Sequence, residues 1–462
     1  MRIAVVGLGK LGSAMAAVLA DIGHTVVGVD LNAEVVRAVN EGRPPVKELG
    51  LEELFRANRL RLSATVDCEG AVAAAEVTFI VTPTPSEPDG SFSLRYVLRA
   101  VEAIGRGLRH RADFHLVVLT STVIPGSTGG VVLPLLESVS GKKCGQDFGL
   151  CYNPEFIALG SVIRDMRNPD MVLIGESDPR SGDILARIYK GICLNNPAVG
   201  RMNFVNAELT KLAVNTFVTT KISYANMLAE LAERLPGADV EVVTAALGRD
   251  TRIGSKYLKA ALGYGGPCFP RDNVAFANLA RRCGVDAVLA EATDLVNRRQ
   301  VQRLENLILS RLPHGGMVGI LGLSYKPGTN VIEESQGLLL AQSLLRRSCR
   351  MAVYDPVALD NAKQELSGKV LFCSSMQECA RQVNVLAITT PWEEFKSLQP
   401  EDLNHTSTRP VLVDCWRILP RDVFSKTADY LTVGVGPDLL RELGHCDKAM
   451  GQTPAAAKEP RQ

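Results

Sequence analysis

Short apolar runs and helical patterns alternate along the chain from its first residues. Residues 3–6 form an apolar run, residues 13–22 form an Ala-rich segment of helical character, and residues 25–29 form a second apolar run. Uninterrupted apolar runs that flank a helix are typical of buried strands in a parallel sheet. The pattern therefore predicts a strand–helix–strand unit at the N-terminus.

The same pattern recurs in both halves of the chain. Further apolar runs occupy residues 77–81, 116–119 and 150–152 and, after a helical stretch, residues 317–323, 349–353, 385–388 and 411–413. We therefore expect an α/β fold with two parallel sheets.

A long helix is predicted between the two sheets, over residues 206–233. Apolar residues recur there at helical spacing, and neither Gly nor Pro interrupts them before Pro236. Such a helix would be about 40 Å long. Lys211 and Asn215 share one of its faces because they are four residues apart, although an ordinary solvated face would explain this pair equally well. A smaller helical region is expected over residues 240–299.

The turn after the first strand carries a phosphate-binding pattern. Gly7, Gly9 and Gly12 join the strand directly to the helix, together with Lys10 and Leu11, and Asp30 ends the second strand. The glycines let a pyrophosphate approach the helix N-terminus, and the carboxylate can bind a ribose 2′-hydroxyl. Because that carboxylate would repel a 2′-phosphate, NAD is favoured over NADP.

Polar and rigid residues follow the later strands of the first sheet. They are Thr82, Pro83, Thr84, Ser121, Thr122, Glu155 and Phe156. Ligands bind at the carboxyl ends of strands in open parallel sheets. Any one of these segments could be an ordinary turn, but their recurrence after successive strands favours a binding site.

The loop over residues 263–272 is the strongest candidate for covalent chemistry. Three glycines and Pro267 precede Cys268, and Pro270, Arg271 and Asp272 follow it. Glycines allow the backbone to approach a ligand closely, and the prolines restrict the loop. A positioned thiol with cations nearby can act as a nucleophile. Most cysteines of such chains are small buried hydrophobic residues, but the Gly/Pro frame favours the nucleophile here.

Composition excludes several other classes of protein. The chain has 462 residues, 46% hydrophobic and 22% charged, with a formal net charge of +1, so charge gives no reason to expect nucleic acid or an anionic membrane as a partner. The 11 cysteines include no CxxC pair, which argues against a zinc ribbon or a dithiol site, and no metal is expected. No apolar run reaches the roughly 20 residues of a membrane span. A cytoplasmic location is the expectation, and residues 441–462, which are poor in large apolar groups, are expected to be a disordered tail.

These motifs, in this order, resemble the UDP-glucose/GDP-mannose dehydrogenase family to about residue 436. The resemblance rests on the glycine turn with Asp30, on the segments at residues 82–85, 121–126 and 153–156, on the stretch from Glu208 to Asn226, on the loop at 263–272, and on residues 323–329. It implies two Rossmann-like domains joined by a long central helix and a small helical domain. The implied limits are 1–203 for NAD binding, 204–300 for the central dimerisation domain with the cysteine loop, and 301–440 for nucleotide-sugar binding.

The resemblance also implies an activity and a partner. Family members use NAD for a four-electron oxidation of a sugar C6 alcohol to a carboxylate, through a thiohemiacetal and a thioester on the cysteine. The substrate would be a nucleotide-sugar, with UDP-glucose oxidised to UDP-glucuronate as the first candidate and GDP-mannose or a UDP-N-acetylhexosamine as alternatives. A homodimer through the central helix, or a higher oligomer, is implied as well.

The resemblance assigns roles to individual residues. The nucleophile would be Cys268, the oxyanion would be stabilised by Lys211 and Asn215, and protons and water would be handled by Glu155, Asp272 and Thr122. The cofactor would contact Gly7, Gly9, Lys10, Leu11, Gly12, Asp30, Thr82, Pro83, Thr84, Ser121 and Thr122. The nucleotide-sugar would contact Glu155, Phe156, Lys211, Asn215, Lys259, Tyr264, Gly265, Phe269, Tyr325, Lys326 and Arg417, with Arg252 reaching the site of the partner subunit.

Two positions depart from the family pattern. An acid usually precedes Gly160, where this chain has Leu159, and an arginine usually occupies the position of Glu333. Both positions are near the nicotinamide in relatives, so the closure around the cofactor is expected to differ. We expect the exchange Leu159→Glu with Glu333→Arg to tighten NAD binding.

Two other classes of function share parts of this pattern. A catalytically silent NAD-binding scaffold would be expected to lack the thiol or the lysine, yet Cys268 and Lys211 are both present. A dehydrogenase that transfers a single hydride would have no use for Cys268 in a glycine loop.

Overall fold

The computed structural model describes residues 1–368, 370–403 and 409–437, which form two compact units. Unit 1 comprises residues 1–216 and 271–287. Unit 2 comprises residues 217–270 and the described residues from 288 onward. The tail predicted over residues 441–462 lies outside the described residues.

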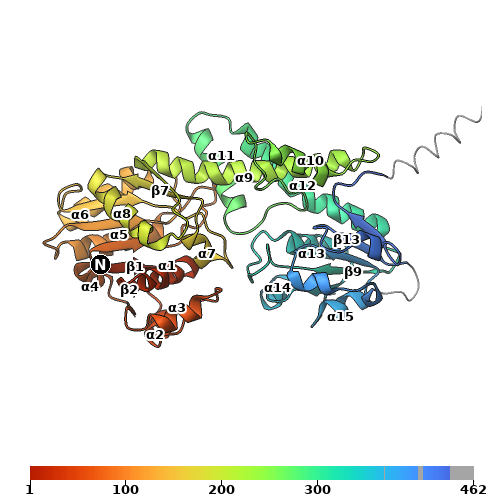
Figure 1. Cartoon of the computed structure of the whole chain (residues 1–462), viewed down its shortest axis with the longest axis horizontal. Coiled ribbons are helices and arrows are strands. Elements are labelled where there is room, and N and C mark those ends of the chain that lie inside the picture. The colour runs from red at the N-terminus through yellow and green to blue at the C-terminus, as the bar shows by residue number, and fades with distance from the viewer. Residues whose placement is uncertain (369, 404–408, 438–462) are drawn as a thin grey trace, which may run out of the picture. The chain divides into compact units, whose positions relative to one another are not determined.

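Unit 1 is built on an eight-stranded sheet with the order β3-β2-β1-β4-β5-β6-β7-β8. Figure 1 labels β1, β2 and β7 of this sheet. Its strands are β1 Arg2–Val6, β2 Thr25–Val29, β3 Leu62–Thr65, β4 Val77–Ile80, β5 His115–Leu119, β6 Phe148–Tyr152, β7 Met171–Glu176 and β8 Ala198–Met202. The first six strands are parallel, whereas β7 is antiparallel to β6. Because the first six run the same way, the turns that follow them lie at one edge of the sheet.

Helices cover both faces of this sheet. They are α1 Lys10–Asp21, α2 Ala33–Asn40, α3 Leu51–Ala57, α4 Cys68–Ala74, α5 Arg95–Leu108, α6 Leu133–Ser140, α7 Val162–Arg167 and α8 Pro179–Ile192, with a π-turn at Thr128–Val132. Successive residues of β5 point to opposite faces: Leu116 and Val118 pack with α1, α3, α7 and α8, while Val117 and Leu119 pack with α4, α5 and α6. The strands are therefore apolar on both sides, as the uninterrupted runs predict.

Unit 2 contains a six-stranded parallel sheet with the order β11-β10-β9-β12-β13-β14. Its strands are β9 Met317–Leu321, β10 Arg350–Tyr354, β11 Val370–Phe372, β12 Val385–Ile388, β13 Val411–Asp414 and β14 Asp429–Thr432. The helices that accompany it are α13 Gln336–Arg346, α14 Leu359–Glu365, α15 Met376–Arg381 and α16 Arg421–Phe424, with 3₁₀ turns at Glu393–Ser397 and Pro400–Asp402. The two expected α/β sheets are confirmed.

The remaining helices connect these sheets along the chain. They are α9 Phe204–Ala232, α10 Val240–Arg249, α11 Phe269–Arg282 and α12 Val288–Arg311. The predicted long helix is confirmed as α9, whose 29 residues contribute to both units. Among the described residues, no helix combines the length and the apolar character that a membrane span requires.

Candidate active site

Three glycines shape the turn between β1 and α1. Gly7 has a φ of +98°, and a Cβ there would lie 2.5 Å from the carbonyl oxygen of Val81. A Cβ on Gly12 would lie 1.8 Å from the carbonyl oxygen of Gly7, so neither position tolerates a side chain. Gly9, in contrast, has open space where its Cβ would be, which leaves the backbone accessible to a ligand.

The start of α1 and the end of β2 carry hydrogen-bonding groups that can still bind a ligand. No described side chain caps the N-terminus of α1, where Lys10 and Leu11 form the first turn, so its N–H groups can receive a phosphate. The half-buried Asp30 accepts hydrogen bonds from the N–H groups of Leu8 and Asn32, each at 2.9 Å. Each carboxylate oxygen accepts more than one hydrogen bond, so a ribose hydroxyl can also bind.

The turns after β4 and β5 are tied to each other. The Ser121 hydroxyl donates to the carbonyl oxygen of Thr82 at 2.6 Å, and the Thr84 hydroxyl donates to that of Thr122 at 2.8 Å. The Thr82 hydroxyl is buried and has no hydrogen-bond partner among the described residues. An unsatisfied polar group is costly, and a cofactor bound along this edge could supply the missing partner. The residues present therefore fit a dinucleotide.

The half-buried Glu155 lies in a polar cluster after β6 whose other members, Asn153, Tyr189 and Lys211, are buried. Lys211 Nζ, from α9, donates to the carbonyl oxygen of Glu155 at 2.6 Å and lies 4.5 Å from the ring centroid of Phe156. The Tyr189 hydroxyl, from α8, contacts both Glu155 Oε1 and, at 2.6 Å, Asn153 Oδ1. Burial raises the pKa of Glu155, while the Tyr189 hydrogen bond and the Lys211 charge oppose that rise. A carboxyl whose pKa is raised can exchange protons nearer to neutral pH.

A second polar cluster lies one turn further along α9. Asn215 Nδ2 donates to Asp272 Oδ2 at 2.6 Å, and Asp272 is only 1% exposed. Arg271 pairs with the other oxygen of Asp272 at 3.3 Å and donates to the carbonyl oxygen of Thr84 at 3.0 Å. The Arg271 guanidinium also lies over the ring of Phe92. The start of α11 is therefore fixed against the turn after β4.

The glycine loop belongs to unit 2 and is held mainly through its backbone. The Tyr264 N–H donates to Asn297 Oδ1 at 2.7 Å, and the Gly266 N–H donates to the carbonyl oxygen of Glu333 at 2.9 Å. A Cβ on Gly265 would lie 2.2 Å from the carbonyl oxygen of Glu334. The loop ends at the exposed Cys268, directly before the N-terminus of α11. A helix N-terminus favours negative charge, which suits a thiolate.

The predicted nucleotide-sugar residues of unit 2 fall into two small groups, of which the first contains aromatic rings and Lys326. Phe269 contacts the rings of Tyr257 and Tyr264, with centroids 6.2 and 6.4 Å away. Lys326 lies 5.9 Å from the Tyr325 ring centroid, and a Cβ on Gly266 would meet this ring at 2.6 Å.

The second group is organised by two carboxylates. Arg417 pairs with Asp239 at 2.7 Å and with Glu241 at 3.4 Å. Lys259 lies 3.9 Å from Glu241, so both cations face one carboxylate. Arg252 is separate from this group: its side chain is 87% exposed and pairs with the neighbouring Asp250.

The predicted site residues thus form two sets, each assembled within its own unit. Unit 1 holds the glycine turn, the strand-end hydroxyls and the clusters around Glu155 and Asp272. Unit 2 holds Cys268 and the predicted nucleotide-sugar residues from Arg252 to Arg417. The roles assigned to these residues stay predictions.

Both departures from the family pattern have a local structural setting. Leu159 packs against the apolar core of unit 1. Beside it, the N–H groups of Gly160 and Val162 donate to the carboxylate of Glu48 at 2.9 and 3.0 Å. Glu333, in unit 2, uses its carbonyl oxygen to hold Gly266.

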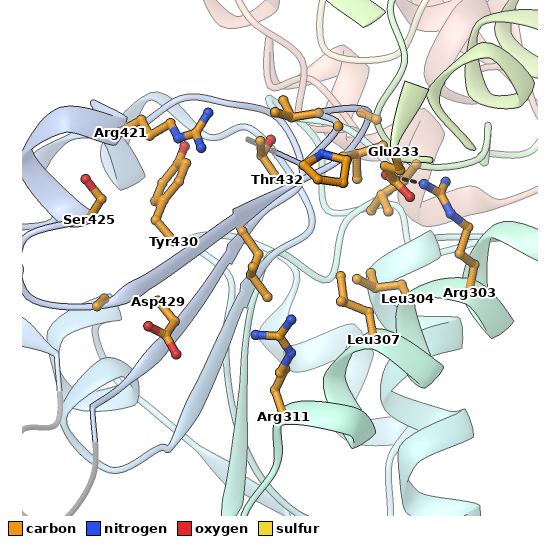
Figure 2. A pocket seen from close by; sticks show the side chains of 18 of the residues that line it. Glu233, Arg303, Leu304, Leu307, Arg311, Arg421, Ser425, Asp429, Tyr430 and Thr432 are labelled. Atoms are coloured by element: carbon orange, nitrogen blue, oxygen red, sulfur yellow. Dashed lines mark ion pairs between the residues drawn. The ribbon is translucent and has the colours of Figure 1, made fainter. Parts of the chain in front are cut away.

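Unit 2 also contains a large groove that none of the predicted site residues lines (Figure 2). Its volume is about 1270 Å³, and it runs between α12 and the edge strand β14. Leu304 and Leu307 contribute apolar surface, and Arg303 pairs there with Glu233, as Figure 2 shows. The groove is therefore distinct from the residues that carry the predicted chemistry.

Several residues of these clusters were missed by sequence reasoning. Asn153 lies in a recognised segment without having been assigned a role, and no motif marks Tyr189, Asn297, Asp239 or Glu241. Tyr189 is 34 residues from Glu155 in the sequence. Periodicity marks it only as a member of the buried face of α8.

Comparison with known proteins places the chain in one family over most of its length. Three family models match: the NAD binding domain of the UDP-glucose/GDP-mannose dehydrogenase family at residues 1–193, its central domain at 205–299 and its UDP binding domain at 319–421. The match to the NAD binding domain, together with the open glycine turn, identifies NAD as the cofactor.

Individual relatives agree with these matches. The chain is 35% identical to a UDP-glucose 6-dehydrogenase of Haloferax volcanii, over 91% of this chain and 98% of the relative. It is 33% identical to a GDP-mannose 6-dehydrogenase of Pseudomonas aeruginosa, over 91% and 97%. A solved UDP-glucose dehydrogenase from Pyrobaculum islandicum is 37% identical, with a TM-score of 0.85 and coverage of 94% of this chain and 98% of that one. The chain therefore belongs to the UDP-glucose/GDP-mannose dehydrogenase family, whose members are NAD-dependent nucleotide-sugar dehydrogenases.

Proposed function

We propose that the protein oxidises the C6 alcohol of a nucleotide-sugar to the carboxylate in two steps, through a covalent intermediate on Cys268. The observation that carries this proposal is the setting of Cys268, an exposed thiol at a helix N-terminus on a loop held through its backbone. A single hydride transfer has no use for such a thiol, whereas oxidation beyond the aldehyde does.

The residues of unit 1 supply the proton chemistry of this proposal. NAD, when held by the glycine turn and strand ends of unit 1, would supply the hydride acceptor for C6 in each of two rounds. In the first round, Glu155 or Asp272, directly or through water, takes the proton of the C6 hydroxyl, leaving an aldehyde. The Cys268 thiolate then adds to the aldehyde carbon, and Lys211 and Asn215 stabilise the oxyanion that forms.

The second half returns the enzyme to its starting state. Loss of the second hydride converts the thiohemiacetal to a thioester. Water, placed by Thr122 and deprotonated by Glu155 or Asp272, attacks the thioester carbon, and the C–S bond breaks to release the acid and the thiolate. The protons that the two carboxylates have taken pass to bulk water. Two hydrides leave C6 in total, so two NAD are reduced for each sugar.

Cofactor and substrate would occupy the two sets of residues already described. In this proposal NAD contacts the turn from Gly7 to Gly12, Asp30, and the segments at 82–84 and 121–122. The residues that the family resemblance assigns to the nucleotide-sugar include Phe156, Lys259, Tyr264, Gly265, Phe269, Tyr325, Lys326 and Arg417. UDP-glucose is the first substrate to test because relatives of that name are 35% and 37% identical over nearly the whole chain. GDP-mannose and UDP-N-acetylhexosamines are the next.

A homodimer through α9 is part of the proposal. Phe217, Tyr224, Met227 and Leu231 are each 47–66% exposed, and their spacing puts them on one face of the helix. An apolar helical face of this kind is typical of a contact with another protein surface. Sedimentation of the purified protein would test this: a dimer is expected, and a monomer would contradict it.

The matched variants Cys268→Ser and Cys283→Ser test the chemistry. Both replace an exposed cysteine, and Cys283 lies just past the other end of α11. With UDP-glucose and excess NAD, Cys268→Ser should release uronic acid on the order of 10³-fold more slowly, because serine is a poor nucleophile at neutral pH. Cys283→Ser should stay within about twofold of the parent. Normal acid release by Cys268→Ser would contradict the covalent route.

A further inference from the structure

Asn153, Tyr189 and Glu155 form a row of hydrogen bonds that ends inside unit 1. Asn153 Nδ2 donates to the carbonyl oxygen of Leu173 at 2.9 Å. Its Oδ1 therefore faces the Tyr189 hydroxyl, 2.6 Å away, and the same hydroxyl contacts Glu155 Oε1. Asn153 is 1% exposed and Tyr189 is 4% exposed, whereas Glu155 is half-buried, so water has little access to the two inner members of the row.

The orientation of Asn153 is fixed by its partners. Turning the amide over would place Oδ1 against the Leu173 carbonyl oxygen, where two acceptors would meet. Asn153 can therefore only accept a hydrogen bond from Tyr189.

The row can adopt two hydrogen-bond arrangements, one for each protonation state of Glu155. Tyr189 has one proton and two neighbouring acceptors. When Glu155 is ionised, the hydroxyl donates to its carboxylate, and Asn153 Oδ1 loses its donor. When Glu155 is protonated, the carboxyl donates to the Tyr189 oxygen, and the hydroxyl donates to Asn153. Only the hydroxyl hydrogen and the Glu155 proton differ between the two arrangements.

We propose that Tyr189 is a positioning residue whose hydroxyl turns between Glu155 and Asn153 as Glu155 loses and gains its proton. The inference rests on the proposed function, in which Glu155 takes a proton from substrate or water and later releases it. The row ends at the backbone carbonyl of Leu173, so it conducts no proton away. Its effect is to keep both protonation states of Glu155 hydrogen-bonded, which lets the carboxyl change state without rearrangement of the site.

Other groups near Glu155 do not replace this function. Among the described residues, the titratable and charged groups that face Glu155 are Tyr189 and Cys193 from α8 and its end, and Lys211 from α9. Burial, and then the charge of Glu155, raise the pKa of the Cys193 thiol to about 11, so this thiol stays neutral around pH 7. Lys211 attracts the carboxylate but carries no acceptor that could hold the protonated form.

Two variants should shift the titration of Glu155 in opposite directions. Tyr189→Phe removes the donor to the carboxylate, so the midpoint should rise by roughly one pH unit. Asn153→Leu removes the competing acceptor, so the hydroxyl donates to Glu155 alone and the midpoint should fall. Tyr354→Phe is the matched control, because it deletes a hydroxyl that contacts the carboxylate of Glu394 at 2.8 Å in unit 2, and it should leave the midpoint of Glu155 unchanged.

The midpoint is best measured without turnover. Difference infrared spectra of the whole protein follow the protonated carboxyl band with pH, and Glu155→Gln identifies the band of Glu155 by its loss. The acid limb of the kcat/KM profile should move in the same direction as the band, with KM for NAD changed less than about twofold. Shifts of the same sign in both variants, or no shift while thermal stability falls, would overturn the inference. If Tyr189→Phe does not fold, the downward shift in Asn153→Leu carries the test.

The infrared titration separates this inference from the proposed function. The Glu155 midpoint could shift in opposite directions in the two variants while the parent protein forms no uronic acid from any nucleotide-sugar. That result would uphold the role of the Tyr189 hydroxyl and reject the proposed reaction. Acid formation without the opposite shifts would do the reverse.

Discussion

The two sheets of the protein begin with the same turn but use it differently. In unit 1, Gly7 follows β1 with a φ of +98° and its N–H donates to Val29; in unit 2, Gly322 follows β9 with a φ of +106° and its N–H donates to Tyr354. Each turn is followed by a second glycine that packs on the first: a Cβ on Gly337 would lie 2.1 Å from the Gly322 carbonyl oxygen.

The difference lies in the acid that ends the neighbouring strand. Asp30 is half-buried and accepts one backbone N–H at each oxygen. Asp355 is 1% exposed and is surrounded by donors: Leu323, Ser324 and Trp392 on one oxygen, and Val357 and Ala358 on the other. The same position in the fold thus holds an acid that can still bind a ligand in unit 1 and an acid committed to structure in unit 2.

The segment after the first glycine reinforces this difference. In unit 1 the helix begins three residues after Gly7, and Gly9 is open to a ligand. In unit 2 the helix begins only at Gln336, and Ser324 stands where unit 1 has Gly9. The intervening loop carries Tyr325 and Lys326 instead of a phosphate-binding helix start. A shared fold therefore does not imply a shared ligand.

The largest expected effect is on Asp355. In Asp355→Asn, the amide NH₂ would face backbone donors in either orientation, leaving buried N–H groups without acceptors. We expect a loss of about 3 kcal/mol or more in the free energy of unfolding, measured by denaturant titration. A loss below about 1 kcal/mol would show that the hydrogen bonds to Asp355 contribute little to the stability of unit 2.

Asp30→Asn should affect the cofactor more than the fold. Loss of the charged acceptor should weaken NAD binding roughly tenfold, which corresponds to about 1.4 kcal/mol. It should also reduce the preference for NAD over NADP, because the repulsion of a 2′-phosphate is removed. Isothermal titration with both dinucleotides measures this. Unchanged affinity for both would reject Asp30 as a ribose ligand.

The smallest expected effect is a pH dependence of stability that His115 contributes in unit 1. His115 is fully buried in β5, where Thr78 and the carbonyl oxygen of Ala75 hold its ring, and burial lowers its pKa from 6.5 to about 4. Between those values the unfolded chain binds a proton that the folded chain does not, so stability falls as pH falls. Its contribution should drop by about 1 kcal/mol from pH 7.5 to 5.5.

Comparison with His115→Gln isolates this contribution. The variant should lose less stability than the parent over the same pH range, while a control such as Tyr354→Phe should keep the slope of the parent. Equal slopes for His115→Gln and the parent would show that His115 does not remain neutral in the folded protein.

The sequence predicted most of the strands whose residues are buried on both sides. Central strands such as β1 and β5 are continuous apolar runs, and α9 has an unbroken helical period. Strand β7, although largely buried, and the edge strands β3, β8, β11 and β14 were not predicted. Of the edge strands, β8 and β14 are largely exposed or half-buried, and β11 has three residues. The reversal at β7 depends on pairing between distant segments, which no local pattern encodes.

The candidate site shows the same division. Residues within motifs, such as Gly7, Asp30 and Cys268, could be singled out from spacing and backbone requirements. Tyr189 and Asp355 could not, because their importance comes from partners brought close only by the fold.

The most direct test of the whole account is the number of NADH formed per UDP-glucose consumed, with purified protein and excess NAD. The account predicts two NADH and an acidic product, because both hydrides leave the same carbon. If UDP-glucose is inert, the same ratio is expected for a GDP-sugar or a UDP-N-acetyl sugar. One NADH per sugar would contradict the account, since it would mean that the reaction stops before Cys268 is used.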